Sequence, residues 1–319
     1  MKKIIFLLLV ILLAGCQKSL TKTEVTKELM GTAVTITVYN DNSTEAKRVI
    51  GLAFDEIERI EGLLSSYKND SEVSLLNENG FIEAPSNDLM YNIKKSLYYS
   101  ELSEGAFDIT VQPILDLYTD SFQNKKMAPT DSEVNDAKKL VSFNNIVIEF
   151  KKISFKKDGV KITLGGIAKG YAVDKAVDVL ERNGVKHALV DMKSSIRAIG
   201  NKGDEEWAIA LQNPRNKNEY IAIIRMDNNS LSTSGDYERY FDENKKFHHI
   251  INPKTGYSAT ELISVTIIAD KAIDADALST SVFVLGKEKG LELIEKMENV
   301  EGLIITKDKE IIKSEGFEG

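Results

Sequence analysis

The segment "ITLGGIAKGYAVD", residues 162–174, decides how the middle of this chain must fold. An apolar run ends at two adjacent glycines, and an amphipathic helix pattern follows them directly. Glycines at such a turn let backbone N–H groups approach a ligand closely, and the helix N-terminus favours an anion. Lys169 would add a positive charge. The spacing matches neither G-x-x-x-x-G-K-[ST] nor G-x-G-x-x-G, so a plain strand-to-helix turn stays open as the alternative.

Around this loop, helix and strand patterns are mixed rather than strictly alternating. Apolar residues at helical spacing predict helices that start near residues 43, 86, 131, 173, 273 and 287. Alternating β-branched runs predict strands, over 29–40, 144–150, 151–157, 160–164, 186–192, 206–214, 219–227, 230–235, 247–252, 262–269, 302–308 and 309–314. This mixture indicates an α+β fold with mixed or antiparallel sheets and flanking helices. Because no Pro/Gly/Ser-rich linker divides residues 29–319, they should form one compact domain, which could have two lobes.

The composition excludes some classes of protein. The chain has 319 residues, with 42% hydrophobic and 28% charged residues, which is typical of a soluble globular protein. Its net charge of -8 argues against nonspecific binding to nucleic acid. Its one cysteine, Cys16, leaves no pair for a disulfide and no cysteines for a zinc site.

The N-terminus predicts export and attachment to lipid. A basic start is followed by an apolar run over 4–14, which is shorter than the roughly 20 residues of a membrane-spanning helix. The run ends in "LAGC", which resembles a bacterial lipobox, so 1–15 would be a signal peptide and Cys16 the acylated mature N-terminus. An ordinary secretory signal is the alternative. The polar residues 16–28 would then be a tether, and the protein would work at the outer face of the cell membrane.

A second candidate for chemistry is "IIADKAIDADALSTSVF", residues 267–283. A helix beginning near Asp274 places Asp276 and Thr280 at i and i+4, on one face. A carboxylate and a hydroxyl are hard oxygen ligands that suit Mg²⁺. The small and apolar neighbours indicate a buried helix, where an unpaired carboxylate is costly. The alternative is that Asp274 caps the helix and the other polar residues form an outer face.

A third candidate is "FHHIINPKTG", residues 247–256, which contains two of the three histidines. In an extended strand, His248 and His249 point to opposite sides. The inward one could act as a general base or contact a phosphate. A hydrogen-bonded structural histidine is the alternative.

Seven segments, in this order, resemble the ApbE family of flavin transferases over about residues 28–305. They are "MGT", "SSY…SEVSLLN", "FDITVQP", "LGGIAKGYAVD", "SGDYERY", "HIINPKTG" and "DADALSTS". The resemblance implies that the protein binds FAD and Mg²⁺, transfers the FMN part of FAD to a Ser or Thr hydroxyl of another protein, and releases AMP. The acceptor would be a secreted or membrane-anchored protein.

The resemblance also assigns expected roles to residues. Asp276 and Thr280 match the metal-binding side chains, with a backbone carbonyl from Gly166 or Ala168. His249 matches the histidine proposed to assist catalysis. The positions that match contacts to FAD are Met30, Tyr67, Ala106, Phe107, Asp108, Thr163, Lys169 and Ile250.

Two departures from the family pattern concern the pocket. Lys193, Ser194 and Ser195 stand where the family usually has Gly-Gly, and these side chains could crowd the ligand. Asn252 replaces a common Asp, which keeps the turn geometry but loses a charge. Two alternative functions remain open from sequence. One is an FAD pyrophosphatase that yields free FMN and AMP. The other is a lipid-anchored solute-binding protein, although the strand-rich stretch 187–268 does not fit repeated strand-helix units.

Overall fold

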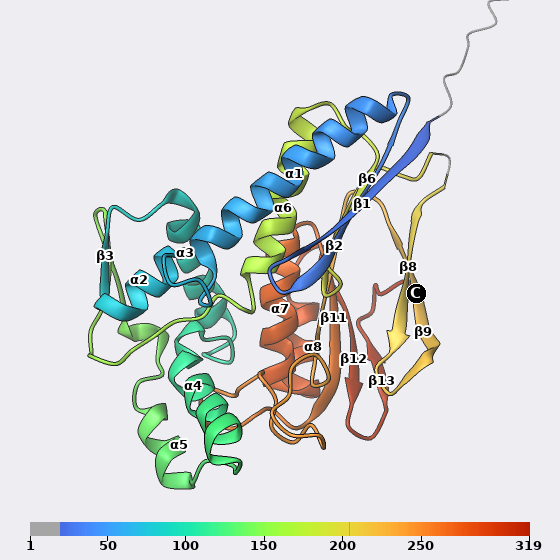
Figure 1. The fold of residues 1–319 in the computed structure, drawn as a ribbon. Helices are drawn as coiled ribbons and strands as arrows, with labels where there is room; N and C mark the ends of the chain where they lie inside the picture. Colours follow the sequence, from blue (N-terminus) through green and yellow to red (C-terminus); the bar gives the residue numbers. More distant parts are fainter. Residues whose placement is uncertain (1–19, 204) are drawn as a thin grey trace, which may run out of the picture.

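A computed structural model describes residues 20–203 and 205–319, and its centre is an eight-stranded antiparallel sheet (Figure 1). The strands, in spatial order, are β1 (Thr21–Leu29), β2 (Thr32–Asn40), β6 (Ala188–Asp191), β7 (Ser195–Ile199), β10 (Ser230–Gly235), β11 (Leu262–Ala269), β12 (Glu301–Thr306) and β13 (Ile311–Lys313). Every neighbouring pair is antiparallel. The predicted α+β class with antiparallel sheets is confirmed.

Both faces of this sheet are covered. One face carries four helices, α1 (Ser43–Leu64), α6 (Ala168–Arg182), α7 (Ala272–Leu285) and α8 (Lys287–Glu295) (Figure 1). The other face carries a hairpin, β8 (Trp207–Asn213) with β9 (Asn216–Met226), whose Trp207 and Ile224 are buried against the sheet. No helix within the described residues is long and apolar enough to cross a membrane.

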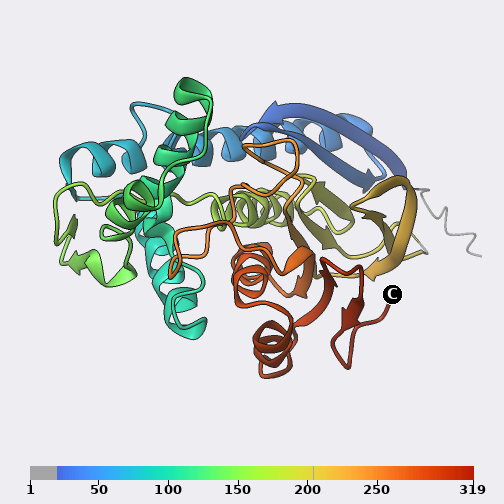
Figure 2. The same ribbon diagram turned by 90° about the horizontal axis from the view of Figure 1, so that it is seen from below.

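A smaller lobe lies beside the sheet (Figures 1 and 2). It contains α2 (Glu72–Asn79), α3 (Asn87–Leu102), α4 (Gln112–Asp120), α5 (Asp131–Lys138), the short helical turns Ile109–Val111, Ser121–Lys125 and Phe143–Asn145, and a small sheet of β3 (Phe81–Glu83), β5 (Lys152–Phe155) and β4 (Ile146–Glu149). One buried apolar cluster runs from Leu76 and Ile93 in this lobe to Val177 in α6 and Val265 in the large sheet. The two lobes therefore share a core.

The helices α6 and α7 cross at very short range. A Cβ atom on Gly170 would lie 2.2 Å from the carbonyl oxygen of Ala272, so only glycine fits there. Beyond the crossing, the Asp174 carboxylate accepts hydrogen bonds from the backbone N–H groups of Ala272 and Ile273, both at 3.0 Å. A side chain of α6 thus caps α7. This explains why α7 begins before Asp274, which instead accepts hydrogen bonds from the small lobe.

The segment expected as a tether over 16–28 is a strand from Thr21 onward. β1 pairs with β2 along its whole length, from Thr21 opposite Asn40 to Leu29 opposite Thr32. Most of its side chains are exposed, because β1 is an edge strand, and charged residues on an edge discourage pairing with other chains. Residues 16–19 lie outside the described residues.

Two predicted strands are not part of any sheet. In 160–164, the side-chain amide of Asn77 accepts from the N–H of Ile162 at 2.7 Å and donates to its carbonyl at 2.8 Å. A side chain therefore replaces the neighbouring strand. In 247–252, only isolated bridges form, at His248 and Ile251. Buried and partly exposed side chains do alternate in both segments, but the segments connect the two lobes and do not pair with a neighbouring strand.

Replacing Gly170 with alanine should destabilise the protein, because the new methyl group would overlap Ala272. Overpacking of this kind typically costs about 1–3 kcal/mol, so we expect a lower melting temperature by circular dichroism. Gly51, in the middle of α1, has no atom of another element within 4 Å of its ideal Cβ position. Gly51→Ala is the matched control, and it should raise stability because alanine favours the helix. Equal effects of both changes would contradict the close crossing.

Candidate active site

Two side chains of α7 face two hydroxyls of β10. The Asp276 carboxylate accepts a hydrogen bond from Ser232 Oγ at 3.3 Å, and Thr280 Oγ1 lies 3.3 Å from Ser234 Oγ. Residues i and i+4 of a helix are about 6 Å apart along its axis, and residues i and i+2 of a strand about 6.6 Å apart. The two spacings match, so both pairs form at once. Asp276 and Thr280 do lie on one face, as the sequence predicted.

The Gly-Gly turn lies directly beside this face. A Cβ atom on Gly166 would lie 3.1 Å from Thr280 Oγ1 and 3.2 Å from the Phe107 ring. The N–H of Gly170, in the first turn of α6, has no partner within the helix and donates to Asp276 Oδ2 at 3.0 Å. In the described chain, no backbone N–H donates to the Gly166 carbonyl. Of the two carbonyls considered, Gly166 is therefore the one left available beside Thr280.

Burial dominates the electrostatics of Asp276. Its side chain is 4% exposed, and burial raises the pKa of the carboxyl, while the charge of Lys169 and the hydrogen bonds from Gly170 and Ser232 act in the opposite direction. Within residues 20–203 and 205–319, no group of three or more His, Cys, Asp or Glu side chains could enclose a metal ion. One carboxylate, one hydroxyl and one carbonyl fit a hard divalent cation that takes its remaining ligands from water and an anionic substrate.

Lys169, in the first turn of α6, extends to a different part of the site. Its ammonium group donates to Ser194 Oγ. Ser194 belongs to the Lys193–Ser195 turn between β6 and β7, the segment that departs from the family pattern. These hydroxyls therefore lie inside the site, and Ser195 Oγ is 3.2 Å from Ser232 Oγ. The other departure, Asn252, keeps its turn, because its Oδ1 accepts from the N–H of Lys254 at 2.9 Å.

The two adjacent histidines have different environments. Both ring nitrogens of the buried His248 are occupied, since Nε2 lies 2.8 Å from the Ala259 carbonyl oxygen and Nδ1 accepts from the N–H of Ile250. His248 is therefore structural. His249 is partly buried, and its Nδ1–H donates to the Arg239 carbonyl at 2.9 Å. This bond fixes the tautomer and leaves Nε2 as an acceptor.

The pKa of His249 is lowered to about 4. Burial is the main cause, and the positive charges of Arg239 and Lys169 add to it. The imidazole is thus neutral at pH 7. A neutral imidazole with a fixed tautomer can accept a proton from a hydroxyl group.

The small-lobe rim of the site carries an exposed aromatic ring. The Tyr67 side chain is 82% exposed, and its hydroxyl accepts from Arg239 Nη1 at 3.4 Å. An exposed ring of this kind can stack on a planar ligand. The backbone N–H of Met30 donates to Glu61 at 2.9 Å, and the neighbouring Gly31 faces the Arg239 guanidinium. Sequence reasoning missed Arg239, for which the only signal was its place in "SGDYERY".

Several predicted contact residues are buried or support the loops of the site. The Asp108 carboxylate accepts from Thr110 and from the N–H of Phe143, so it holds its own loop in place. Ala106 and Phe107 are buried next to it, and the Ile250 side chain lies in the core. Thr163 Oγ1 accepts from the N–H of Gly165 at 3.2 Å and supports the Gly-Gly turn. Any contact of Ala106 or Ile250 with a ligand would have to involve the backbone.

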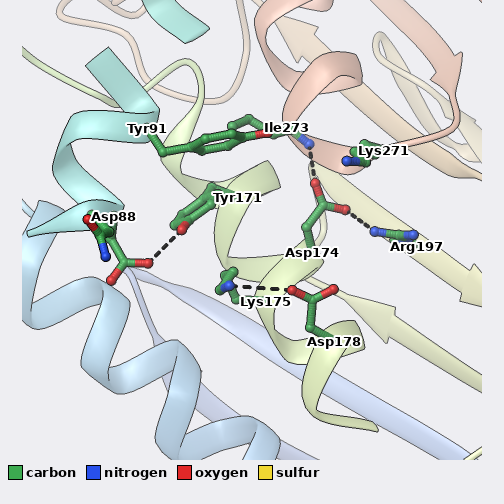
Figure 3. Close-up of a pocket in the computed structure, with 10 residues that line it drawn as sticks. Asp88, Tyr91, Tyr171, Asp174, Lys175, Asp178, Arg197, Lys271 and Ile273 are labelled. Carbon is green, nitrogen blue, oxygen red and sulfur yellow. Dashed lines mark hydrogen bonds and ion pairs between the residues drawn. The ribbon is translucent and has the colours of Figure 1, made fainter. Parts of the chain in front are cut away.

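A separate pocket of about 310 Å³ lies between α3, α6 and the start of α7 (Figure 3). None of its lining residues is a predicted site residue. Most of its polar side chains pair with each other, as the dashed lines in Figure 3 show. Tyr171 donates a hydrogen bond to Asp88, and two ion pairs join Arg197 to Asp174 and Lys175 to Asp178. This network connects α6 to its neighbours, and its side chains are already paired with each other rather than free to bind a ligand.

Comparison with known proteins agrees with this geometry. A protein of Haemophilus influenzae named FAD:protein FMN transferase is 33% identical over 313 residues, which cover 93% of this chain and 90% of that protein. A protein of Treponema pallidum with the same name is 30% identical and covers 91% of this chain and 86% of its own length.

Solved structures show the same fold. The ApbE protein of Thermotoga maritima superimposes with a TM-score of 0.85 at 33% identity, covering 92% of this chain and 97% of its own. The flavin transferase ApbE of Vibrio cholerae gives a TM-score of 0.81 at 27% identity, covering 93% and 98%. The model of the ApbE family matches residues 30–304. This chain, with its Gly-Gly turn set against the Asp276–Thr280 face, therefore belongs to the ApbE family.

Proposed function

We propose that this enzyme transfers the FMN part of FAD to a Ser or Thr hydroxyl of an acceptor protein and releases AMP. The observation that carries the proposal is the meeting of the Asp276 carboxylate, the Thr280 hydroxyl and the Gly166 carbonyl beside a helix N-terminus. Relatives with 33% and 30% identity are named FAD:protein FMN transferase. FAD is the substrate, and its diphosphate is the anion that such a place would receive.

The residues that would hold Mg²⁺ are Asp276 and Thr280 through their side chains and Gly166 through its carbonyl. A bound divalent cation would neutralise charge on the diphosphate oxygens. The other contributions come from the chain itself. Lys169 and the N–H groups at the start of α6 provide fixed positive potential towards the phosphates. The exposed ring of Tyr67 offers a stacking surface for the flavin.

The chemical step exchanges one P–O bond for another. Nε2 of His249 accepts the proton of the acceptor's hydroxyl group, whose oxygen attacks the phosphorus on the flavin side of the diphosphate. The bond from that phosphorus to the bridging oxygen breaks, and AMP leaves with the bonding electrons. The products are a phosphodiester between FMN and the acceptor protein, and free AMP.

The two alternative functions are not favoured. An FAD pyrophosphatase would use water in place of the protein hydroxyl, and the relatives are named as transferases. A solute-binding protein of two repeated α/β lobes differs from this fold, whose main sheet is antiparallel. Mixing the protein with FAD, Mg²⁺ and a secreted flavoprotein separates the three. Flavin fluorescence that stays with the acceptor protein after denaturation indicates transfer, and free FMN indicates hydrolysis. FAD that stays bound and chemically unchanged indicates a solute-binding protein.

We also propose that the enzyme is anchored by lipid at Cys16 on the outer face of the cell membrane. The support is the lipobox-like sequence at 13–16, which lies outside the described residues. The acceptor would then be secreted or membrane-anchored as well. Because FAD must reach the same compartment, the reaction depends on FAD outside the cytoplasm.

Asp276→Asn should abolish most transfer without unfolding the protein. The amide keeps the shape of the side chain but removes the charge that would hold the cation, and losing one such electrostatic group typically costs about 10²–10³-fold in rate. The melting temperature should stay the same or rise, because a buried charge is removed. Covalent flavin fluorescence after denaturing electrophoresis measures transfer. Near-normal transfer would refute the metal assignment.

The pH dependence of transfer tests His249. Because the pKa of the folded protein is about 4, the imidazole stays neutral from pH 8 down to about pH 5, and its proton acceptance is lost only as the pH falls through 4. The ratio kcat/KM should therefore show no acid limb near 6.5, the usual pKa of histidine. His249→Ala should reduce kcat by about 10²–10⁴-fold, whereas full activity of that variant would exclude the role.

Cys16→Ser should release the protein from the membrane fraction. One or more acyl chains on this cysteine would supply the attachment, and no other cysteine could replace it. Fractionation of cells, followed by immunoblotting, measures the distribution. In detergent, the rate of transfer should not change. If the variant stays with the membrane, another feature anchors the protein.

A further inference from the structure

The two opposite charges of the site, Lys169 and Asp276, lie near each other but do not pair. The charge of Lys169 acts on the Asp276 carboxyl, yet no direct ion pair joins them in the part of the chain that the structure describes. The hydrogen-bond donors to the carboxylate are the N–H of Gly170 and the hydroxyl of Ser232. The ammonium group of Lys169 donates to Ser194 Oγ instead.

Ser194 is held firmly in position. Its N–H donates to the Met192 carbonyl at 2.8 Å, and its own carbonyl accepts from the N–H of Thr233 at 2.8 Å. Ser232 Oγ lies 2.9 Å from the same carbonyl oxygen, so its single proton is shared between this oxygen and the Asp276 carboxylate. The preceding Lys193 has a φ of 65°, which completes the tight turn. Ser194 is thus fixed to β10, the same strand that faces Asp276. Its hydroxyl oxygen is therefore held in place as a hydrogen-bond acceptor for the flexible Lys169 side chain.

A buried carboxylate attracts any ammonium group that can reach it, because burial removes the water that would otherwise solvate the charge. Lys169 has a long, flexible side chain and lies in the same site. Without another partner, its ammonium would move onto the carboxylate. It would then occupy the oxygen atoms that a divalent cation needs, and the cation would have to displace it.

We propose that Ser194 is a positioning residue whose hydroxyl holds the Lys169 ammonium off Asp276. The carboxylate stays open to a divalent cation, and the ammonium stays available for the phosphates of the substrate. This inference rests on the proposed function, since it takes Asp276 as the metal-binding carboxylate. It gives a function to a residue of the Lys193–Ser195 segment, where the family usually has Gly-Gly.

The test measures binding of Mn²⁺ to the full chain in detergent, by electron paramagnetic resonance and without FAD. Four proteins are compared, the wild type, Ser194→Ala, Lys169→Met and the double variant. We expect Ser194→Ala to raise the Kd for Mn²⁺ about tenfold, a coupling typical of residues in contact. Lys169→Met should bind at least as tightly as the wild type. The double variant should match Lys169→Met, because without the ammonium the hydroxyl has nothing to restrain.

Ser281→Ala is the matched control. Ser281 is a buried serine of α7 whose hydroxyl donates to the Ala277 carbonyl at 2.7 Å, away from Lys169. Its Kd should equal that of the wild type, and thermal unfolding should show that all variants are folded.

Each outcome is decisive. If the wild type binds Mn²⁺ and Ser194→Ala binds it equally well, the inference is wrong and the proposed function stands. If Ser194→Ala weakens binding to the same extent with or without Lys169, the serine acts through another group and the inference is also wrong. If the wild type binds no Mn²⁺ even after FAD is added, the metal assignment in the proposed function fails, and the inference fails with it.

Discussion

The close crossing of α6 and α7 at Gly170 is the contact on which the rest of the site depends. The missing side chain lets the helices approach so closely that the Gly170 N–H reaches Asp276, 106 residues further along the chain. This N–H belongs to the first turn of α6, where it has no partner within the helix. One glycine therefore holds the carboxylate at the start of α6. A larger residue would separate the two helices and disconnect these groups.

The rest of the site is brought to this crossing by the two lobes. The loop that carries His249 extends from the large sheet to the small lobe, where Phe241 and Phe247 pack on Tyr118 with ring centroids 5.6 Å and 5.8 Å away. Arg239, in the same loop, links Tyr67 on one side to His249 on the other through its side chain and its carbonyl. His249, the Tyr67 ring and the Asp276–Thr280 face thus belong to three different parts of the chain, and the aromatic cluster packs the loop against the small lobe.

Burial sets the chemistry of these groups in opposite directions. It keeps His249 neutral and so able to accept a proton, and it raises the cost of an isolated charge on Asp276. The Gly170 N–H, the Ser232 hydroxyl and the charge of Lys169 favour the charged form of the carboxyl group, and a divalent cation would act in the same direction. The Lys193–Ser195 turn adds the hydroxyl groups of Ser194 and Ser195 to this balance.

The sequence by itself determined the parts that depend on local spacing. Six helices and the shared face of Asp276 and Thr280 follow from the 3.6-residue period, whereas α2 and α4 were not predicted. The order of the seven motifs identified the family. Only the tertiary structure decided which histidine is free, that Asp174 caps α7, that Asn77 replaces a strand beside Ile162, and that Ser194 meets Lys169. Those contacts join residues that are 25 to 99 positions apart, except in the histidine pair. No local pattern encodes such a contact, because its partner is chosen by how the layers pack.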